Sequence, residues 1–327
     1  MKPLVHKVLR SIALAAAVAL GGCTWLFPKE MPPVTHVPTA APLVKPIAPR
    51  GLALVLSGGS ARGFAHIGVI KVLEQAGIRP DLVVGTSAGA IIGTLYASGK
   101  SGREIEAISR EADGAMAGDT DWLRLIRLKS LGLRAGNALH AFIGKRIGNY
   151  SIEDMPIPLA VVATDLASGT ATAFTRGDAG HAVHAACAVP GVFEPVDIGG
   201  RKYADGGLSS PLPVEIARKL GARIVIAVDV IYPPTDSPPP DSALDVLFQT
   251  FLVQTFRLKE HEIGQADLVI APVMHTVKQY GFKDREQLIA AGAAAARAAL
   301  PKIHQLLART APQPVQPPRE KAPAVTR

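Results

Sequence analysis

Short apolar runs, glycine-rich turns and helical patterns alternate along the middle of the chain. The run 52–56 (Leu-Ala-Leu-Val-Leu) predicts a strand that is buried on both faces. A helical pattern of apolar positions over 64–73 follows, and Gly77 ends it. The run 82–84 predicts a second buried strand, and a helix is predicted over 88–97.

The same alternation continues to the C-terminal part of the chain. Further strands are predicted at 158–163, 223–228 and 267–271, and helices at 212–220 and 285–307. Residues 102–148 read as mainly helical without a good strand, and could cover the sheet. Strands that alternate with helices in this way predict an α/β fold, a three-layer sandwich with a mostly parallel central sheet flanked by helices.

The two ends of the 327-residue chain depart from this pattern. A basic start, a short apolar stretch and a small-residue close are typical of a secretory signal, which is too short for a spanning helix. Prolines dominate the segment that follows it and the last residues of the chain, as in tethers and disordered tails. The predicted organisation is therefore a signal peptide (1–22), a tether (23–50), a folded domain (51–309) and a disordered tail (310–327).

Cys23 marks the end of the predicted signal. The sequence Leu20-Gly21-Gly22-Cys23 resembles a bacterial lipobox, which implies cleavage before Cys23 and lipidation of its thiol. Several acyl chains anchor a protein stably, whereas one gives only marginal membrane binding. Thr24, in place of Asp, implies by the same resemblance an exported lipoprotein of the outer membrane that faces the periplasm. An uncleaved apolar N-terminus, or a secretion signal with an incidental cysteine, stays open as the alternative.

Composition narrows the class of protein. Hydrophobic residues make up 48% of the chain, enough for a sizeable core, and the body of the chain has no apolar run near 18 residues. The formal net charge is +8, and without the three cations of the predicted signal it is +5 (32 Lys and Arg against 27 Asp and Glu), a mild basicity that fits an anionic membrane surface. Basic runs interleaved with aromatics, which nucleic-acid binding would need, are absent. Cys187 lies in a run of small residues, which predicts packing in the core.

Ser87 is the first candidate catalytic residue. The pentapeptide Gly85-Thr86-Ser87-Ala88-Gly89 lies between a predicted strand and a predicted helix, the arrangement of a nucleophile elbow. Near-absent side chains at Gly85 and Gly89 permit the strained turn, and the helix that begins there directs its dipole at developing negative charge. The pentapeptide alone is weak support, because glycine is abundant in this chain.

A glycine-rich turn follows the first predicted strand and opens a helix, a position where backbone N–H groups can hold phosphate or an oxyanion. A dinucleotide site fits poorly, because Ser60 occupies the place of the middle glycine and Asp81 precedes its strand. A P-loop fits no better, since no Gly-Lys-Ser/Thr follows. An oxyanion loop is the better interpretation, and Arg62 either braces it or is a surface residue. Its residues are Gly58, Gly59, Ser60, Ala61, Arg62 and Gly63.

Asp205 opens a third motif, Asp205-Gly206-Gly207, which taken alone is only a turn signal. His66 lies one turn into the helix after the glycine loop, so it is the candidate base for a catalytic triad. His181 and His184 are spaced three apart, but no carboxylate or cysteine completes a metal motif there. Neither a metal nor a cofactor is therefore predicted.

The three motifs, in their order and spacing, strongly resemble those of patatin-like phospholipases, and the resemblance spans residues 51–301. It is nearest to the bacterial branch related to neuropathy target esterase. It implies a dyad in which Ser87 is the nucleophile and Asp205 the general base, with backbone N–H groups, chiefly those of Gly59 and Ser60, holding the oxyanion. Ser60 departs from the family's usual run of glycines, which leaves the exact shape of this loop open.

The resemblance thus implies a serine acyl hydrolase of the phospholipase or lysophospholipase type, acting on membrane lipids through an acyl-enzyme. Acyl transfer or thioester hydrolysis by the same dyad stays open, because only the acceptor or leaving group differs. From another class, the chain could be a lipoprotein of the cell envelope that binds lipid without catalysis. All three motifs are intact, which disfavours that alternative.

Overall fold

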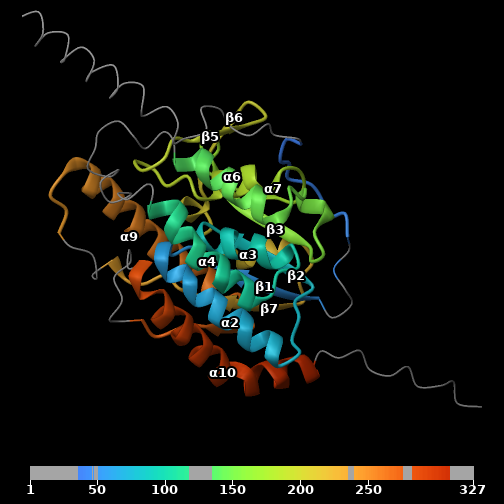
Figure 1. Ribbon diagram of the computed structural model, residues 1–327. Helices are drawn as coiled ribbons and strands as arrows, with labels where there is room; N and C mark the ends of the chain where they lie inside the picture. Colours follow the sequence, from blue (N-terminus) through green and yellow to red (C-terminus); the bar gives the residue numbers. More distant parts are fainter. Residues whose placement is uncertain are drawn as a thin grey trace, which may run out of the picture.

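The computed structural model describes residues 36–45, 47, 51–117, 135–234, 239–274 and 282–309. The predicted signal peptide, Cys23 and the predicted tail lie outside the described residues. The described chain folds around one eight-stranded sheet with helices on its two faces (Figure 1). No helix in the described part of the chain has the length and the hydropathy that crossing a membrane requires.

The sheet is mixed, and its core is parallel. Strands β1, β2, β3, β7 and β8 pair in parallel, whereas β4, β5 and β6 add antiparallel pairing on the β3 side. The strand order is β5-β6-β3-β2-β1-β7-β8, with β4 paired to β3. The strands are β1 (Leu52–Leu56), β2 (Leu82–Thr86), β3 (Leu159–Asp165), β4 (Ala171–Phe174), β5 (Val196–Ile198), β6 (Arg201–Asp205), β7 (Ile224–Val228) and β8 (Leu268–Ile270).

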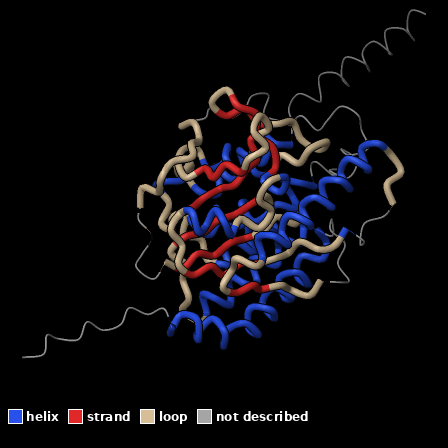
Figure 2. The backbone as a smooth tube through the Cα atoms, turned by 180° about the vertical axis from the view of Figure 1, so that it is seen from behind, coloured by secondary structure: helices blue, strands red, loops and turns tan. Residues whose placement is uncertain are grey.

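The central strands are apolar along their whole length because helices cover both faces of the sheet. Alternate residues of β1 show this: Leu52, Leu54 and Leu56 belong to the larger apolar core, and Ala53 and Val55 to the smaller one. The larger core includes side chains of α2, α3, α7 and α10. The smaller core includes side chains of α8 and the end of α9. The view from behind shows the strands under this thinner cover (Figure 2).

The helices alternate with the strands along the chain, as the sequence predicts. They are α2 (Phe64–Gln75), α3 (Ala88–Ala97), α4 (Gly102–Ala117), α6 (Ala135–Ile147), α7 (Ala179–Ala186), α8 (Val214–Lys219), α9 (Ala243–Ile263) and α10 (Arg285–Arg309). Short 3-10 helices are η1 (Ser60–Gly63), η2 (Ile152–Asp154), η3 (Gly206–Leu208) and η5 (Phe282–Asp284). The predicted three-layer α/β sandwich with a mostly parallel sheet is confirmed.

The segment 102–148 forms helices α4 and α6 wherever it is described, and both pack within the larger helical layer. Helix α4 contacts α2 and α3, and α6 contacts α7 and α3. Its central part, residues 118–134, lies outside the described residues.

Residues 36–45, which belong to the predicted tether, lie against the domain. Thr39 forms an antiparallel bridge with Arg176. The Thr175 hydroxyl accepts from the Ala41 amide at 3.1 Å and donates to the Ala41 carbonyl. This part of the segment is therefore held on the end of β4 by backbone and side-chain hydrogen bonds.

Candidate active site

Ser87 lies at the turn between β2 and α3, in a strained backbone conformation with φ 53° and ψ −123°. Such conformations cost about 1–3 kcal/mol and gather at functional sites. Both flanking glycines are required by space, because a Cβ on Gly85 would lie 2.4 Å from the Gly89 carbonyl oxygen. A Cβ on Gly89 would lie 2.2 Å from that of Leu56. The turn places Ser87, which is half-buried, at the carboxyl end of the sheet, as in a nucleophile elbow.

Asp205 ends strand β6 and meets the end of β2 on the sheet. Strand β4 lies along one edge of β3, where it pairs with both Val162 and Ala163. On the opposite edge, Val162 pairs with Thr86 of β2, and the next residue, Ala163, pairs with Asp205 of β6. Strands β2 and β6 therefore follow one another along the same edge of β3. They meet end to end there, and a Cβ on Gly206 would lie 3.0 Å from the Thr86 Cγ2. The sheet therefore brings the Ser87 turn and the Asp205 turn together.

The Asp205 carboxylate is buried, with 1% of the residue exposed. Its Oδ1 accepts a hydrogen bond from the Gly207 amide at 2.8 Å. Its Oδ2 has no hydrogen bond of normal geometry among the described residues. Burial raises the pKa of Asp205 to about 7, against smaller lowering effects of the Gly207 amide and of the nearby Ser87 hydroxyl. A carboxylate with such a pKa is well matched to accepting a proton near neutral pH.

The glycine loop passes over Ser87, since a Cβ on Gly58 would lie 3.3 Å from the Ser87 Cβ. The amides of Gly58 and Arg62 have partners: Gly58 donates to the Pro211 carbonyl at 3.0 Å, and Arg62 to the Gly59 carbonyl at 3.1 Å. Gly59 and Ser60, by contrast, are half-buried. Gly58 and Arg62 belong to the loop, but their amides are not free to hold an oxyanion.

Two adjacent residues of this loop, Gly59 and Ser60, have positive φ angles. The φ of Gly59, 154°, lies in a region that side chains rarely adopt, and a Cβ there would lie 2.7 Å from the Val230 Cγ2. Ser60 has φ 52°, in the left-handed region, which a non-glycine residue reaches at a cost of about 1–2 kcal/mol. A serine therefore fits at position 60, whereas position 59 requires glycine.

The remaining loop residues hold it on the helices. Arg62 is buried, and its guanidinium lies 4.7 Å from the centre of the Tyr232 ring, so it braces the loop and is not a surface residue. Ala61 is buried, and Gly63 packs on Ala88, where a Cβ would lie 2.6 Å from the Ala88 Cβ.

His66 is fully buried, and its Nε2 lies 3.0 Å from the Ser57 carbonyl oxygen, to which it must donate. Burial lowers its pKa to about 4, so the ring is neutral near pH 7. This hydrogen bond uses the ring to hold the start of the glycine loop. His66 thus supports the loop through its backbone, and Asp205 is the titratable group placed beside Ser87.

His181 and His184 lie on α7, and His181 stacks on His140 with ring centres 5.6 Å apart. Burial lowers the pKa of both α7 histidines, that of His184 to about 4. Within the described residues, no group of three or more His, Cys, Asp or Glu side chains is arranged to hold a metal ion. Cys187 is half-buried at the end of this helix, and burial raises the pKa of its thiol.

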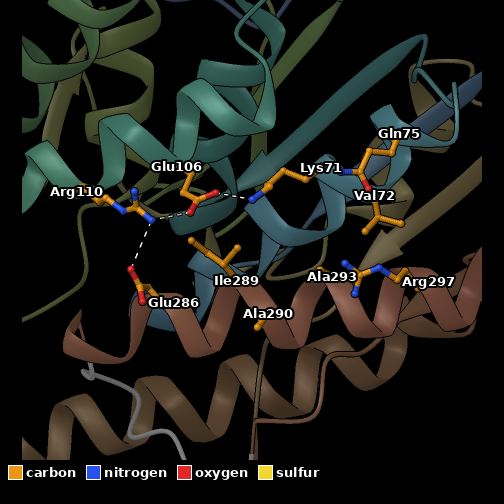
Figure 3. Close-up of a pocket in the computed structure, with 10 residues that line it drawn as sticks. All are labelled: Lys71, Val72, Gln75, Glu106, Arg110, Glu286, Ile289, Ala290, Ala293 and Arg297. Carbon is orange, nitrogen blue, oxygen red and sulfur yellow. Dashed lines mark hydrogen bonds and ion pairs between the residues drawn. The ribbon is translucent and has the colours of Figure 1, made fainter.

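A surface pocket of about 430 Å³ lies elsewhere, between α2, α4 and α10 (Figure 3). Ion pairs line it, including Lys71 to Glu106 at 2.5 Å and Glu106 to Arg110 at 2.9 Å. None of the residues of the three motifs lines this pocket. It is separate from the Ser87 site.

Sequence comparison identifies the family. The sequence pattern of the patatin-like phospholipases matches residues 54–218, which include Ser87, Asp205 and the glycine loop. The chain belongs to the patatin-like phospholipase family.

The chain is similar to curated proteins whose names are given at the family level. An uncharacterized NTE family protein of Mycobacterium tuberculosis is 31% identical over 300 residues, which cover 83% of this patatin-like chain and 51% of the relative. The human patatin-like phospholipase domain-containing protein 6 is 36% identical over 181 residues, or 55% of this chain and 13% of that protein. The chain thus spans about half the length of the mycobacterial relative. Among solved structures, VipD from Legionella pneumophila aligns with a TM-score of 0.44 and 13% identity, over 81% of this chain and 71% of VipD.

Proposed function

We propose that this patatin-like chain is a serine acyl hydrolase for lipid esters, of the phospholipase or lysophospholipase type, with Ser87 as nucleophile and Asp205 as general base. The observation that carries the proposal is the meeting of the strained Ser87 turn with a buried carboxylate whose pKa is raised to about 7. A base of this pKa, next to a serine, can accept its proton directly without a histidine.

The reaction would proceed in two steps. Ser87 Oγ attacks the ester carbonyl carbon as its proton passes to Asp205, and the amides of Gly59 and Ser60 donate to the oxyanion. Collapse of the tetrahedral intermediate breaks the ester bond, and the leaving alcohol takes the proton from Asp205. Asp205 then accepts a proton from water, whose oxygen attacks the acyl-Ser87 carbonyl. The fatty acid leaves, and the proton returns to Ser87.

The test compares purified protein lacking residues 1–22 with its Ser87→Ala and Asp205→Asn variants. We expect the wild type to release fatty acid from lysophospholipid or phospholipid vesicles and both variants to lose at least about 1,000-fold in kcat, as when a member of a catalytic triad is removed. Equal activity of the wild type and Ser87→Ala would contradict the proposal. Absence of any ester hydrolysis, together with vesicle binding, would support a lipid-binding lipoprotein instead.

The same assay separates hydrolysis from acyl transfer and from thioester cleavage. Products are measured by mass spectrometry with and without an added alcohol acceptor, and with an acyl thioester in place of the ester. A hydrolase gives free fatty acid as its main product in the presence of the acceptor.

We further propose that the protein is an exported lipoprotein, anchored through lipidated Cys23 at the outer membrane facing the periplasm, where its lipid substrate lies. The lipobox resemblance of residues 20–23 supports this proposal. Mass spectrometry of the N-terminal peptide is expected to find acyl chains on Cys23, and Cys23→Ser is expected to release the protein from membranes. A Cys23→Ser protein that stays in the membrane fraction would contradict it.

A further inference from the structure

Glu262 is a buried carboxylate at the C-terminal end of α9 that none of the three motifs includes. The residue is 8% exposed, and burial raises its pKa to about 7, with a further rise from the nearby Glu215. Isolated buried carboxylates are costly, so such a group is expected to have specific partners. Its two oxygens have them: Oε1 accepts from the Ser210 hydroxyl, and Oε2 accepts from the Leu212 amide at 2.9 Å.

The segment that Glu262 holds, residues 209–212, contacts the nucleophile side of the site. The Thr86 hydroxyl, directly before Ser87, donates to the Ser210 carbonyl at 2.8 Å. The Gly58 amide donates to the Pro211 carbonyl at 3.0 Å. The Ser210 hydroxyl and the Leu212 amide of the segment are therefore bound to Glu262. Its Ser210 and Pro211 carbonyls hold Thr86, directly before Ser87, and Gly58 at the start of the glycine loop.

The same segment also contacts the Asp205 turn. The Ser209 and Ser210 amides both donate to the Gly206 carbonyl, at 3.1 Å and 2.8 Å. The Ser209 hydroxyl lies 2.7 Å from the Thr164 hydroxyl, which donates to the Asp205 carbonyl at 2.9 Å. Residues 209–212 thus connect the nucleophile, the oxyanion loop and the base.

We propose that Glu262 is a positioning residue for the Ser87 site: by holding residues 209–212 with both carboxylate oxygens, it fixes the glycine loop and the Ser87 turn relative to Asp205. Its role for catalysis rests on the proposed function, whereas its bracing of the glycine loop does not. Glu262 does not touch the reacting atoms, and it acts through Ser210 and Leu212. Displacements of about 1 Å in such sites cost up to about 100-fold in rate.

The kinetic test uses Glu262→Ala and the isosteric Glu262→Gln on a water-soluble short-chain acyl ester. Glu262→Ala is expected to lower kcat by about 10- to 100-fold with little change in KM. Glu262→Gln can accept from Leu212 and donate to Ser210, and is expected to restore kcat to within about 3-fold of the wild type. The matched control is Glu260→Gln, an exposed carboxylate on the same helix, paired with Arg257, that should leave kcat unchanged. Equal loss in the Gln and Ala variants, or a wild-type kcat in Glu262→Ala, would overturn the proposal.

A double-mutant cycle that combines Glu262→Ala with Thr86→Val tests whether Glu262 acts on the Ser87 turn through Ser210. Because Glu262 acts on the Ser87 turn through Ser210, the double variant is expected to lose less in kcat than the product of the two single losses. Strictly additive losses would show that Glu262 does not act on the Ser87 turn through the Thr86 contact, and would overturn that part of the proposal.

Hydrogen–deuterium exchange tests the bracing without any substrate. Glu262→Ala is expected to speed exchange by at least about tenfold in peptides that contain Gly58, which Glu262 does not contact, while α10 keeps its protection. If Glu262→Ala does not fold, Ser210→Ala removes one of the two contacts and is expected to speed Gly58 exchange to a smaller extent. Unchanged exchange at Gly58 would overturn the bracing. Equal ester hydrolysis by the wild type and Ser87→Ala would instead contradict only the proposed function.

Discussion

Thr86 and Asp205 lie opposite consecutive residues, Val162 and Ala163, on one edge of strand β3. A parallel strand and an antiparallel strand therefore end against each other, with Ser87 directly after the first and Asp205 closing the second. Backbone pairing in the sheet sets the two strand ends against each other, and residues 209–212 hold the turns that follow them. Sites on such rigid elements hold their geometry better than sites on loops.

The raised pKa of Asp205 predicts how the rate depends on pH. If the ionised carboxylate is the base, kcat/KM for a soluble ester should fall about tenfold per pH unit below about 7 and level off above it. The measurement is kcat/KM between pH 5 and pH 9. Glu262 also has a pKa near 7, so the control is Glu262→Gln, which should keep the same midpoint. A rate that is independent of pH between 5 and 8 would exclude Asp205 as the base.

The same carboxylate is expected to destabilise the fold at alkaline pH. Its pKa is 3.8 in a model peptide and about 7 when folded, so its contribution is most favourable below pH 3.8 and is lost as the pH rises through 7. Asp205→Asn removes this loss. We expect the variant to gain stability over the wild type by up to about 4 kcal/mol between pH 4 and pH 8.

Urea unfolding at several pH values measures this gain. The matched control is Asp197→Asn, an exposed carboxylate on β5, whose effect should stay under about 1 kcal/mol at every pH. A variant that is no more stable than the wild type at pH 8 would argue against a raised pKa of the buried Asp205 carboxylate.

In the glycine loop, we expect a substitution at Gly59 to impair activity and a substitution at Ser60 to be tolerated. Gly59→Ala places a Cβ against Val230 in a backbone region closed to side chains, and should lower kcat by about 100-fold by displacing an oxyanion donor. Ser60→Gly keeps the amide and should change kcat by less than about 3-fold. Gly77→Ala is the control: it also has a positive φ, of 69°, but nothing lies within 4 Å, so only stability should fall slightly. Wild-type kcat in Gly59→Ala would remove the loop from the catalytic site.

Local sequence pattern predicts the Ser87 side of the site well. The strand predicted at 52–56 and the helix predicted at 88–97 have those bounds in the structure, and the strand predicted at 82–84 extends to Thr86. These elements are short apolar runs and glycine turns, whose structure depends on adjacent residues. The Ser87 elbow follows from them almost directly.

The Asp205 side depends on contacts that local pattern does not reveal. Strand β6 has two exposed residues, Arg201 and Lys202, and no clear apolar alternation, so only the family resemblance pointed to Asp205. Glu262 lies 52 residues from Ser210 in the sequence. No motif joins the two, and the contact exists only because α9 packs against η3, which directly precedes Ser209 and Ser210. Such long-range partners of a site require the structure.

His66 provides the sharpest test between a dyad and a triad. Its ring donates to the Ser57 carbonyl and is held neutral by burial, with a pKa of about 4. His66→Gln keeps a donor for that carbonyl, and we expect its kcat to stay within about 10-fold of the wild type, far above Ser87→Ala. The control is His261→Gln, an exposed histidine on α9, which should leave both activity and stability unchanged.

The stability of the same variant should change with pH in a defined direction. A folded pKa of about 4, below the ordinary 6.5, means that the stability from neutral His66 is present above pH 6.5 and is lost as the pH falls through 4. Glutamine does not titrate, so His66→Gln should lose less stability than the wild type between pH 7 and pH 4.5 in urea unfolding. If His66→Gln were instead as inactive as Ser87→Ala while unfolding at the same urea concentration as the wild type, the histidine would be acting in catalysis and the dyad would be wrong.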